Sequence, residues 1–289
     1  MPQSRALETL TLADDLTITR MGYGAMQLAG PRVFGEPRDR PEALAVLREV
    51  AASGITHVDT ADYYGPVITN QLIREALHPY DGITVATKVG WRRRDDGPPI
   101  QSLAPADLQA QVHDNLNHLG VDALDLVNLR LASAEGAIPD SIEAGFSALA
   151  ELQQKGLIRH LGVSNVSSDQ VTQAQRIAPV VTIQNLYNLA NRRDDDLVVR
   201  AATEHIAFVP FFPLGGFSPL QSDILSSVAG RLGASPQQVA LAWLLQRSTT
   251  MSVIPGTSSR AHLRENIAAV DLALPADAIE DLDAIGTDG

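Results

Sequence analysis

The chain has 289 residues and a formal net charge of −12, with 45% apolar and 19% charged residues. This composition fits a globular protein with a sizeable core, and the acidic balance argues against binding to nucleic acid or to an anionic membrane surface. The absence of cysteine excludes disulfides, cysteine-ligated zinc and thiol catalysis. The chain shows no signal-peptide pattern and no apolar run of the roughly 18 residues that span a membrane, so we expect a cytoplasmic protein.

After a hairpin predicted over residues 7–19, short β-branched runs alternate with helical stretches. The predicted strands are residues 21–24, 55–59, 83–88, 124–130, 158–163, 181–184, 206–211 and 251–254. The predicted helices are residues 41–52, 69–77, 105–119, 141–155, 168–177, 194–204 and 236–246, with another from about Ser259. Eight strands alternating with helices predict an α/β fold, a (β/α)8 TIM barrel, as one domain over residues 1–289. A doubly wound sheet is disfavoured because the glycine pattern after the first strand lacks its third glycine.

Functional residues of such a barrel lie at the carboxyl ends of its strands. The second predicted strand ends in Asp59, which Tyr64 follows, and the third ends in Lys88. Each residue alone also fits a structural role, but a carboxylate, a phenol and an ammonium at neighbouring strand ends point to acid–base chemistry. We expect Lys88, held by Asp59, to lower the pKa of Tyr64 by about 1–3 units, which would make the phenol a general acid near neutral pH.

Seven motifs in chain order resemble those of the aldo-keto reductase family, and together they cover essentially the whole chain. The motifs are Asp-Thr-Ala-x-x-Tyr-Gly at 59–65, Thr87-Lys88, Gly-Val-Ser-Asn at 162–165, Gln184, Pro-Leu-Gly-Gly at 213–216, Ile-Pro-Gly at 254–256 and Glu265-Asn266. The resemblance implies an eight-stranded barrel, NADP(H) bound without a Rossmann domain, and carbonyl–alcohol interconversion. It also implies that Asp59, Tyr64 and Lys88 are three members of a catalytic tetrad. Within the family, the sequence is most similar to bacterial pyridoxal reductases, on Val-Asn-Leu-Arg at 127–130 and Pro-Phe-Phe-Pro-Leu-Gly-Gly at 210–216.

Arg130 stands where the family places the fourth tetrad member, a histidine. Its permanent charge rules out proton relay, but it can donate hydrogen bonds to a carbonyl oxygen and stabilise developing negative charge there. Strand alternation places Asn128 on the same face, and Trp91 opens a polar insertion over residues 91–103, so we expect Tyr64, Trp91, Asn128 and Arg130 to contact substrate. The alternative is that Arg130 forms an ion pair at the barrel rim with a carboxylate such as Glu135.

The resemblance further implies a cofactor site. Ser164, Asn165 and Gln184 match positions that bind the nicotinamide carboxamide, and Phe211 matches the position that stacks on the ring. Residues 213–217 would run along the pyrophosphate, and small hydroxyl residues before a helix would suit a 2′-phosphate. The expected set is Gly24, Ala25, Met26, Asp59, Ser164, Asn165, Gln184, Phe211, Pro213, Leu214, Gly215, Gly216, Ile254, Gly256, Thr257, Ser258, Arg264, Glu265 and Asn266. The sequence lacks a lysine that many NADPH-dependent relatives carry near Gly256.

These observations predict an NADPH-dependent reductase of a small aldehyde, pyridoxal being the best candidate, with Tyr64 as general acid. We expect no metal site, His57 in the core, and a monomer or weak homo-oligomer. Three other interpretations stay open: a reductase of another carbonyl compound, an NADP(H)-binding regulatory subunit with little catalysis, and a phosphate-binding lyase or isomerase. The missing histidine keeps the second interpretation open, whereas the intact Asp59, Tyr64 and Lys88 argue against it. The third would have no use for the nicotinamide-binding motifs.

Overall fold

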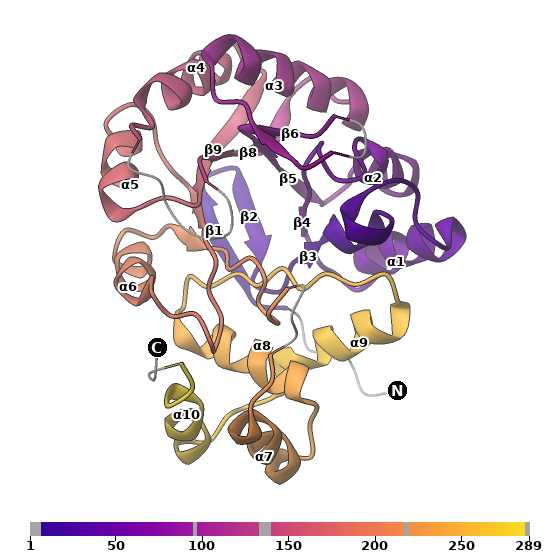
Figure 1. Ribbon diagram of the computed structural model, residues 1–289, viewed down its shortest axis with the longest axis vertical. Coiled ribbons are helices and arrows are strands. Elements are labelled where there is room, and N and C mark those ends of the chain that lie inside the picture. The colour runs from indigo at the N-terminus through magenta and orange to yellow at the C-terminus, as the bar shows by residue number, and fades with distance from the viewer. Residues whose placement is uncertain (1–6, 95–96, 133–139, 217–219, 287–289) are drawn as a thin grey trace.

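The computed structural model describes residues 7–94, 97–132, 140–216 and 220–286. Parallel strands curl around a central axis and helices surround them (Figure 1). Along the sheet the strands follow chain order: β3 (Tyr23–Gly24), β4 (His57–Asp59), β5 (Thr84–Val89), β8 (Leu124–Arg130), β9 (Ile158–Ser164), β10 (Thr182–Gln184) and β11 (Ala207–Phe208). This order of parallel neighbours joined by helices is that of the expected α/β barrel.

The expected eighth strand, residues 251–254, closes the barrel through isolated bridges on both sides. Met251 pairs with Phe208 of β11, and Val253 pairs with Met21, just before β3. The backbone amide of Val253 donates to the Arg20 carbonyl at 2.8 Å. Hydrogen bonds therefore run around the whole ring, although this last segment is too irregular to form a continuous ladder.

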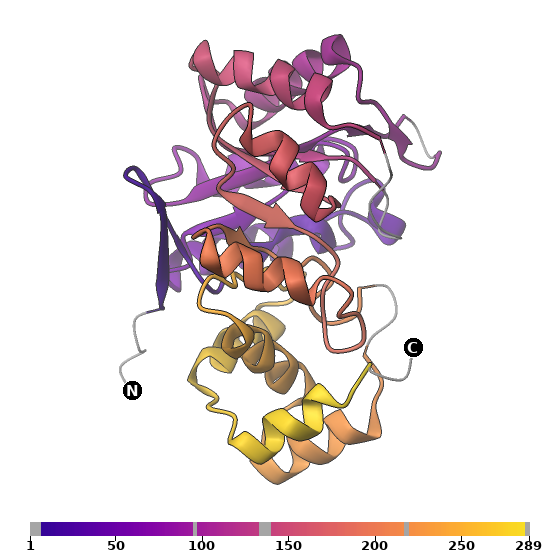
Figure 2. The same cartoon turned by 90° about the vertical axis from the view of Figure 1, so that its left-hand side faces the viewer.

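Two hairpins lie at opposite ends of the barrel (Figure 2). The first, β1 (Thr9–Ala13) with β2 (Leu16–Thr19), was expected. Its Leu16 and Ile18 pack on buried Ala86 and Leu126 from the barrel strands, so the hairpin covers the floor of the barrel. The second, β6 (Trp91–Arg92) with β7 (Ile100–Gln101), stands in the stretch that the sequence presents only as a polar insertion.

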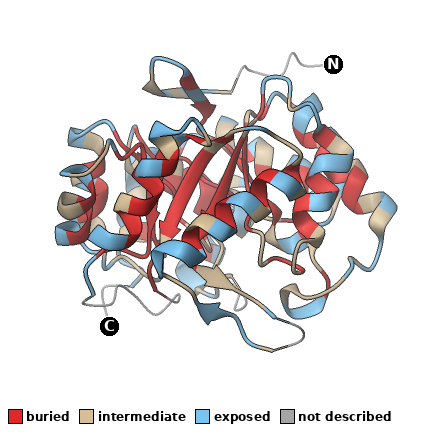
Figure 3. Cartoon of the chain, turned by 90° about the horizontal axis from the view of Figure 1, so that it is seen from above, coloured by how far each residue is buried: buried red, intermediate tan, exposed pale blue. Residues whose placement is uncertain are grey.

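The helices bury one face on the barrel and expose the other, as Figure 3 shows by colour. They are α1 (Arg40–Ala52), α2 (Ile68–Leu77), α3 (Pro105–Leu119), α4 (Glu143–Gln154), α5 (Ser168–Gln175), α6 (Asp195–Thr203), α7 (Asp223–Leu232), α8 (Pro236–Arg247), α9 (Arg260–Ala268) and α10 (Ala276–Asp283). Helix starts follow local rules: Ser235 and Gln238 form a capping box at α8, where Pro236 occupies the first turn. Helices α7 and α10 were not expected, although the Ser222 side chain caps α7 by accepting from the Leu225 backbone amide. Within the described residues, no helix is long and apolar enough to cross a membrane.

Candidate active site

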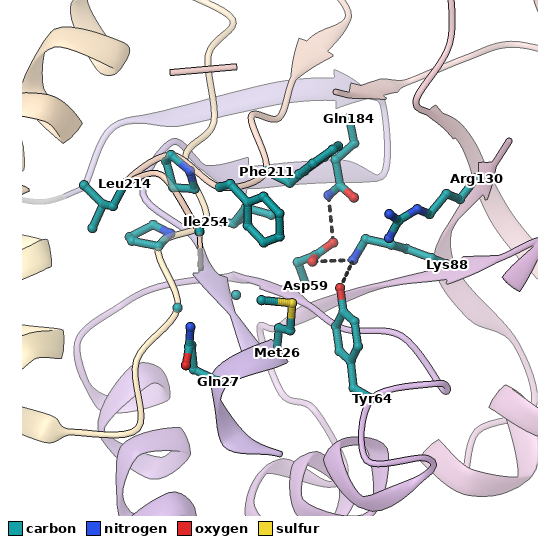
Figure 4. A pocket seen from close by; sticks show the side chains of 16 residues that line it. Met26, Gln27, Asp59, Tyr64, Lys88, Arg130, Gln184, Phe211, Leu214 and Ile254 are labelled. Atoms are coloured by element: carbon teal, nitrogen blue, oxygen red, sulfur yellow. Dashed lines mark hydrogen bonds and ion pairs between the residues drawn. The ribbon is translucent and has the colours of Figure 1, made fainter. Parts of the chain in front are cut away.

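Lys88 lies at the centre of a buried polar cluster at the carboxyl ends of β4 and β5 (Figure 4). Its Nζ donates to Asp59 Oδ1 at 2.5 Å, to the Thr60 carbonyl at 2.9 Å and to the Tyr64 hydroxyl at 3.3 Å. These three acceptors use all three protons of the ammonium. The other Asp59 oxygen accepts from Gln184 Nε2 at 2.8 Å. The structure therefore brings together three residues that the sequence proposed, and it fixes each by hydrogen bonds.

Tyr64 reaches the cluster because the chain turns sharply after β4. Gly65 has φ of +108°, and a Cβ there would lie 2.5 Å from the Cβ of Ile68, so this position requires glycine. The same turn is tied to the loop after β3, since the Gly65 amide donates to the Val33 carbonyl and the Gly35 amide donates to the Gly65 carbonyl. The Asp-Thr-Ala-x-x-Tyr-Gly motif thus encodes a local fold that aims the phenol at Lys88.

The expectation that the pKa of Tyr64 is lowered is wrong for the site as it stands. Burial raises the pKa of Tyr64 above its usual value, and the charge of Asp59 raises it further. The charge of Arg130 and the neighbouring Tyr63 side chain act in the opposite direction and lower the pKa. Sequence reasoning counted Lys88 but not the carboxylate that neutralises it or the loss of solvent around the phenol. Tyr64 is consequently held as a neutral phenol that still carries its proton.

Arg130 ends β8 and lines the same pocket, beside Lys88 (Figure 4). Its Nε donates to the Ala132 carbonyl at 3.1 Å, and one terminal nitrogen donates to the Tyr63 hydroxyl. The guanidinium carbon lies 5.8, 5.6 and 5.7 Å from the ring centroids of Tyr63, Trp91 and Phe211. All these partners are neutral. Glu135, the carboxylate of the alternative interpretation, lies outside the described residues.

A pocket opens beside this cluster, between the strand ends and the segments 24–27, 211–216 and 254–256. Thirteen of the expected site residues line it: Gly24, Met26, Asp59, Tyr64, Lys88, Arg130, Gln184, Phe211, Pro213, Leu214, Gly216, Ile254 and Gly256. Three further lining residues were not proposed as site residues: Gln27, Phe212 and Pro255. Each adjoins an expected residue in sequence, so extending the expected segments by one position would have found them.

The other expected residues do not line this pocket. They are Ala25, Trp91, Asn128, Ser164, Asn165, Gly215, Thr257, Ser258, Arg264, Glu265 and Asn266. Asn128 is buried in the barrel interior, where its Oδ1 accepts from Thr182 Oγ1 at 2.7 Å. It faces inward as alternation predicted, but one pleat deeper than the pocket, so the structure does not support substrate contact. Phe217, the last residue of the predicted pyrophosphate segment, lies outside the described residues.

Two buried polar atoms beside the pocket fit the carboxamide of a nicotinamide. Ser164 Oγ and Gln184 Oε1 have no hydrogen-bond partner in the described part of the chain. The two residues are paired in register across β9 and β10, so their side chains lie side by side at the strand ends. Asn165 adjoins them, and its backbone amide donates to the backbone carbonyl of Gln184 at 3.1 Å. A carboxamide offers both a donor and an acceptor to such groups, and the partly buried Phe211 offers a ring face nearby.

The phosphate end of the expected cofactor site differs from prediction. Arg264 is exposed and binds Glu49 of α1, with Nε–Oε1 and Nη2–Oε2 distances of 2.5 and 3.0 Å. The Thr257 hydroxyl accepts from the Ser259 amide at 3.1 Å within its own loop. Ser258 instead lines a second cavity with the exposed Arg38, and this cavity shares Met26, Gln27 and Gly216 with the first. Arg264 is thus paired with Glu49 in this structure, and its expected role at an anion site stays a prediction.

His57 lies in the core as expected, and only 1% of it is exposed. Its Nδ1 is 3.2 Å from the Ser252 hydroxyl. Burial lowers the pKa of His57 to about 4, so the imidazole is neutral. Within the described residues, no three or more His, Asp or Glu side chains form a group that could hold a metal ion.

Comparisons with known proteins identify the family. The model of the Aldo/keto reductase family matches residues 20–287. The chain is 57% identical to pyridoxine 4-dehydrogenase of Escherichia coli K12 over 272 residues, which cover 93% of this chain and 95% of that protein. A thermostable aldo-keto reductase, solved with the inhibitor epalrestat, superposes with a TM-score of 0.81 at 27% identity, covering 96% of this chain and 99% of that one. An aldo/keto reductase of Klebsiella pneumoniae, solved with NADP and acetate, has the same fold, with a TM-score of 0.78 at 23% identity and coverage of 96% and 95%. The chain therefore belongs to the aldo/keto reductase family and is an oxidoreductase.

Proposed function

We propose that this oxidoreductase reduces an aldehyde with NADPH and that pyridoxal, which becomes pyridoxine, is its substrate. The observation that carries the chemistry is the buried arrangement of Tyr64, Lys88 and Asp59 beside a pocket. The substrate is supported by the name of the Escherichia coli relative and by Arg130 on the pocket wall. The wider expectations of one domain, a monomer or weak homo-oligomer and a cytoplasmic location remain predictions from the sequence.

The bound nicotinamide would supply a hydride to the carbonyl carbon, while Tyr64 donates its proton to the carbonyl oxygen. The Lys88 ammonium, which already donates to the Tyr64 oxygen, stabilises the phenolate that forms. Asp59 pairs with the ammonium and holds it in place. Arg130 brings a second positive charge towards the oxygen on which negative charge develops. Ser164, Asn165 and Gln184 would orient the nicotinamide, because their polar atoms lie together at the strand ends.

Arg130 also favours a substrate that carries an oxygen anion next to its aldehyde. Pyridoxal has a ring hydroxyl that ionises readily in this position, and a guanidinium pairs strongly with such an oxygen. The buried indole Nε1 of Trp91 has no hydrogen-bond partner in the described part of the chain, and its ring centroid lies 5.6 Å from the Arg130 guanidinium carbon. Arg130 thus brings a charged hydrogen-bond donor to the pocket wall, and Trp91, which does not line the pocket, packs beside it.

The test is turnover of an aldehyde panel with NADPH and with NADH. We expect pyridoxal to give a higher kcat/KM than an aliphatic aldehyde of similar size, and NADPH to give a higher value than NADH. Comparable values for the two aldehydes would refute the substrate assignment. Binding of NADPH, followed by fluorescence, without turnover of any aldehyde would support a regulatory subunit instead. The intact contacts of Lys88 with Asp59 and Tyr64 argue against that outcome.

A further inference from the structure

The side chains of Thr60 and Thr87 belong to two of the expected motifs but do not line the pocket. Each threonine is the chain neighbour of a residue in the catalytic cluster, and neighbouring side chains at a strand end face opposite ways. Their hydroxyls therefore face the helices: Thr60 Oγ1 donates to Asn70 Oδ1 of α2 at 2.8 Å, and Thr87 Oγ1 donates to Asn115 Oδ1 of α3 at 2.6 Å. All four residues are at most 1% exposed.

Asn70 and Asn115, which we call the asparagine pair, also bind each other. Asn70 Nδ2 donates to Asn115 Oδ1 and to Asp62 Oδ1, each at 3.1 Å. Asn115 Nδ2 donates to the Gln111 carbonyl at 2.8 Å. Together with the bond from Thr60, these contacts use the oxygen and both amide protons of Asn70. A buried polar network whose members all have partners holds its segments in one arrangement.

The bond between Thr60 and Asn70 closes the loop of chain that carries Tyr64. Thr60 is also held at its backbone amide, which donates to the Ala86 carbonyl of β5 at 2.8 Å. Because its amide and its side chain are both fixed, the Thr60 carbonyl keeps one direction, and Lys88 Nζ donates to it at 2.9 Å. The same ammonium donates to the Tyr64 hydroxyl at 3.3 Å, the longest of its three hydrogen bonds. A small displacement of Lys88 would therefore weaken the bond to Tyr64 first.

We propose that the asparagine pair is a positioning device for the Lys88 ammonium. Acting through Thr60 and Thr87, the pair fixes the carbonyl that holds the ammonium and thereby keeps one ammonium proton on the Tyr64 oxygen. This inference rests on the proposed function, because that contact stabilises the phenolate formed when Tyr64 gives its proton to substrate. Neither asparagine lines the pocket, so the pair acts only through the segments that it holds.

The decisive variant is Thr60→Val, which keeps the shape of the side chain and removes its hydroxyl. The first measurement is hydrogen exchange of the Lys88 ammonium with water, followed by NMR on protein labelled at the lysine nitrogens. The chain contains only two lysines, the buried Lys88 and the exposed Lys155, so the two signals are readily told apart. We expect exchange at Lys88 to become about tenfold faster in Thr60→Val, and Thr60→Ser, which restores the hydroxyl, to exchange like the wild type. This measurement needs no substrate and therefore stands apart from the proposed function.

The second measurement is the pH dependence of kcat for oxidation of pyridoxine with NADP+, where Tyr64 must lose its proton. A less firmly held ammonium stabilises the phenolate less, so the rising limb should move roughly 0.5–1 pH unit towards alkaline pH, with the KM for NADP+ unchanged. The other groups that act on the pKa of Tyr64, namely Asp59, Arg130 and Tyr63, are unchanged in these variants. If the wild-type enzyme leaves pyridoxine untouched, only the proposed substrate fails, and the profile is measured with benzyl alcohol. If it oxidises neither alcohol, the proposed function fails and the exchange rate alone decides.

The matched control is Thr182→Val, which also removes a buried threonine hydroxyl that donates to an asparagine oxygen, Asn128 Oδ1. Thr182 contacts none of the acceptors of Lys88, so this variant should leave the exchange rate and the limb in place. Thr87→Val reaches the asparagine pair from β5 and should change both measurements in the same direction as Thr60→Val, which keeps the test available if Thr60→Val does not fold. A wild-type exchange rate or an unmoved limb in these two variants, or an equal change in Thr182→Val, would overturn the proposal.

Discussion

Replacing Arg130 with methionine tests the substrate assignment most directly. Methionine keeps an unbranched apolar stem of similar reach, so it can still pack among Tyr63, Trp91 and Phe211. What disappears is the positive charge, the hydrogen bond to Tyr63 and the bond to the Ala132 carbonyl. The described partners of the guanidinium are neutral, so the variant leaves none of them with an uncompensated charge.

The expected loss depends on what the substrate offers to Arg130. A hydrogen bond to a charged group contributes about 1.5–3 kcal/mol, and more than this is lost when a buried anion is left unpaired. For pyridoxal, with its ring oxygen anion, kcat/KM should therefore fall roughly 10- to 100-fold. With an aliphatic aldehyde, the variant loses only the stabilisation that Arg130 gives to the carbonyl oxygen and to Tyr64, so kcat/KM should fall less. We expect the fold decrease in kcat/KM to be about ten times larger, or more, for pyridoxal than for the aliphatic aldehyde.

The assay is NADPH consumption with pyridoxal and with butanal at pH 7, for the wild-type enzyme and for Arg130→Met. Thermal denaturation of both proteins checks that the variant is folded. Equal losses on the two aldehydes would mean that Arg130 serves the carbonyl alone. No loss on either would mean that Arg130 has only a structural role at the barrel rim, and the substrate would then be supported only by similarity to the Escherichia coli enzyme.

Three further outcomes are expected. Tyr64→Phe should lower turnover about 10²- to 10⁴-fold with little change in NADPH binding, and a variant that keeps half of the wild-type rate would remove Tyr64 as general acid. Arg264→Ala should change the Kd of NADPH less than about twofold, because Glu49 already holds this side chain; isothermal titration would show a larger loss if Arg264 binds the 2′-phosphate. Because burial lowers the pKa of His57 from 6.5 to about 4, the unfolded chain binds the proton more readily, and up to about 3 kcal/mol of stability should be lost as the pH falls from 6.5 to 4. Denaturant titration of His57→Gln should show a flatter dependence in this window, and an equal slope in both proteins would contradict the assignment.

The sequence determined the barrel and most of the residues that line the candidate pocket, because both depend on patterns among neighbouring residues. Strand-forming runs end in Asp59, Lys88, Arg130, Ser164 and Gln184, and in a parallel barrel all such ends meet on one face. Start signals such as the Ser235 capping box need only a few neighbouring residues. Chain order and spacing were therefore enough to place these residues around one opening, even where short strands such as β11 ended earlier than expected.

The tertiary structure decided properties that depend on packing between distant segments. The pKa of Tyr64 follows from burial and from the charge of Asp59, which no local pattern measures. Arg264 meets Glu49 because α9 packs on α1, more than two hundred residues away in sequence. The position of Tyr63 between Arg130 and Tyr64 likewise required the loop after β4 and the end of β8 to be brought together. Residue types and their order along the chain indicate which chemical groups are present at the site. Solvent exclusion and long-range contacts determine the charge of each group, the direction in which its side chain points and its interaction partners.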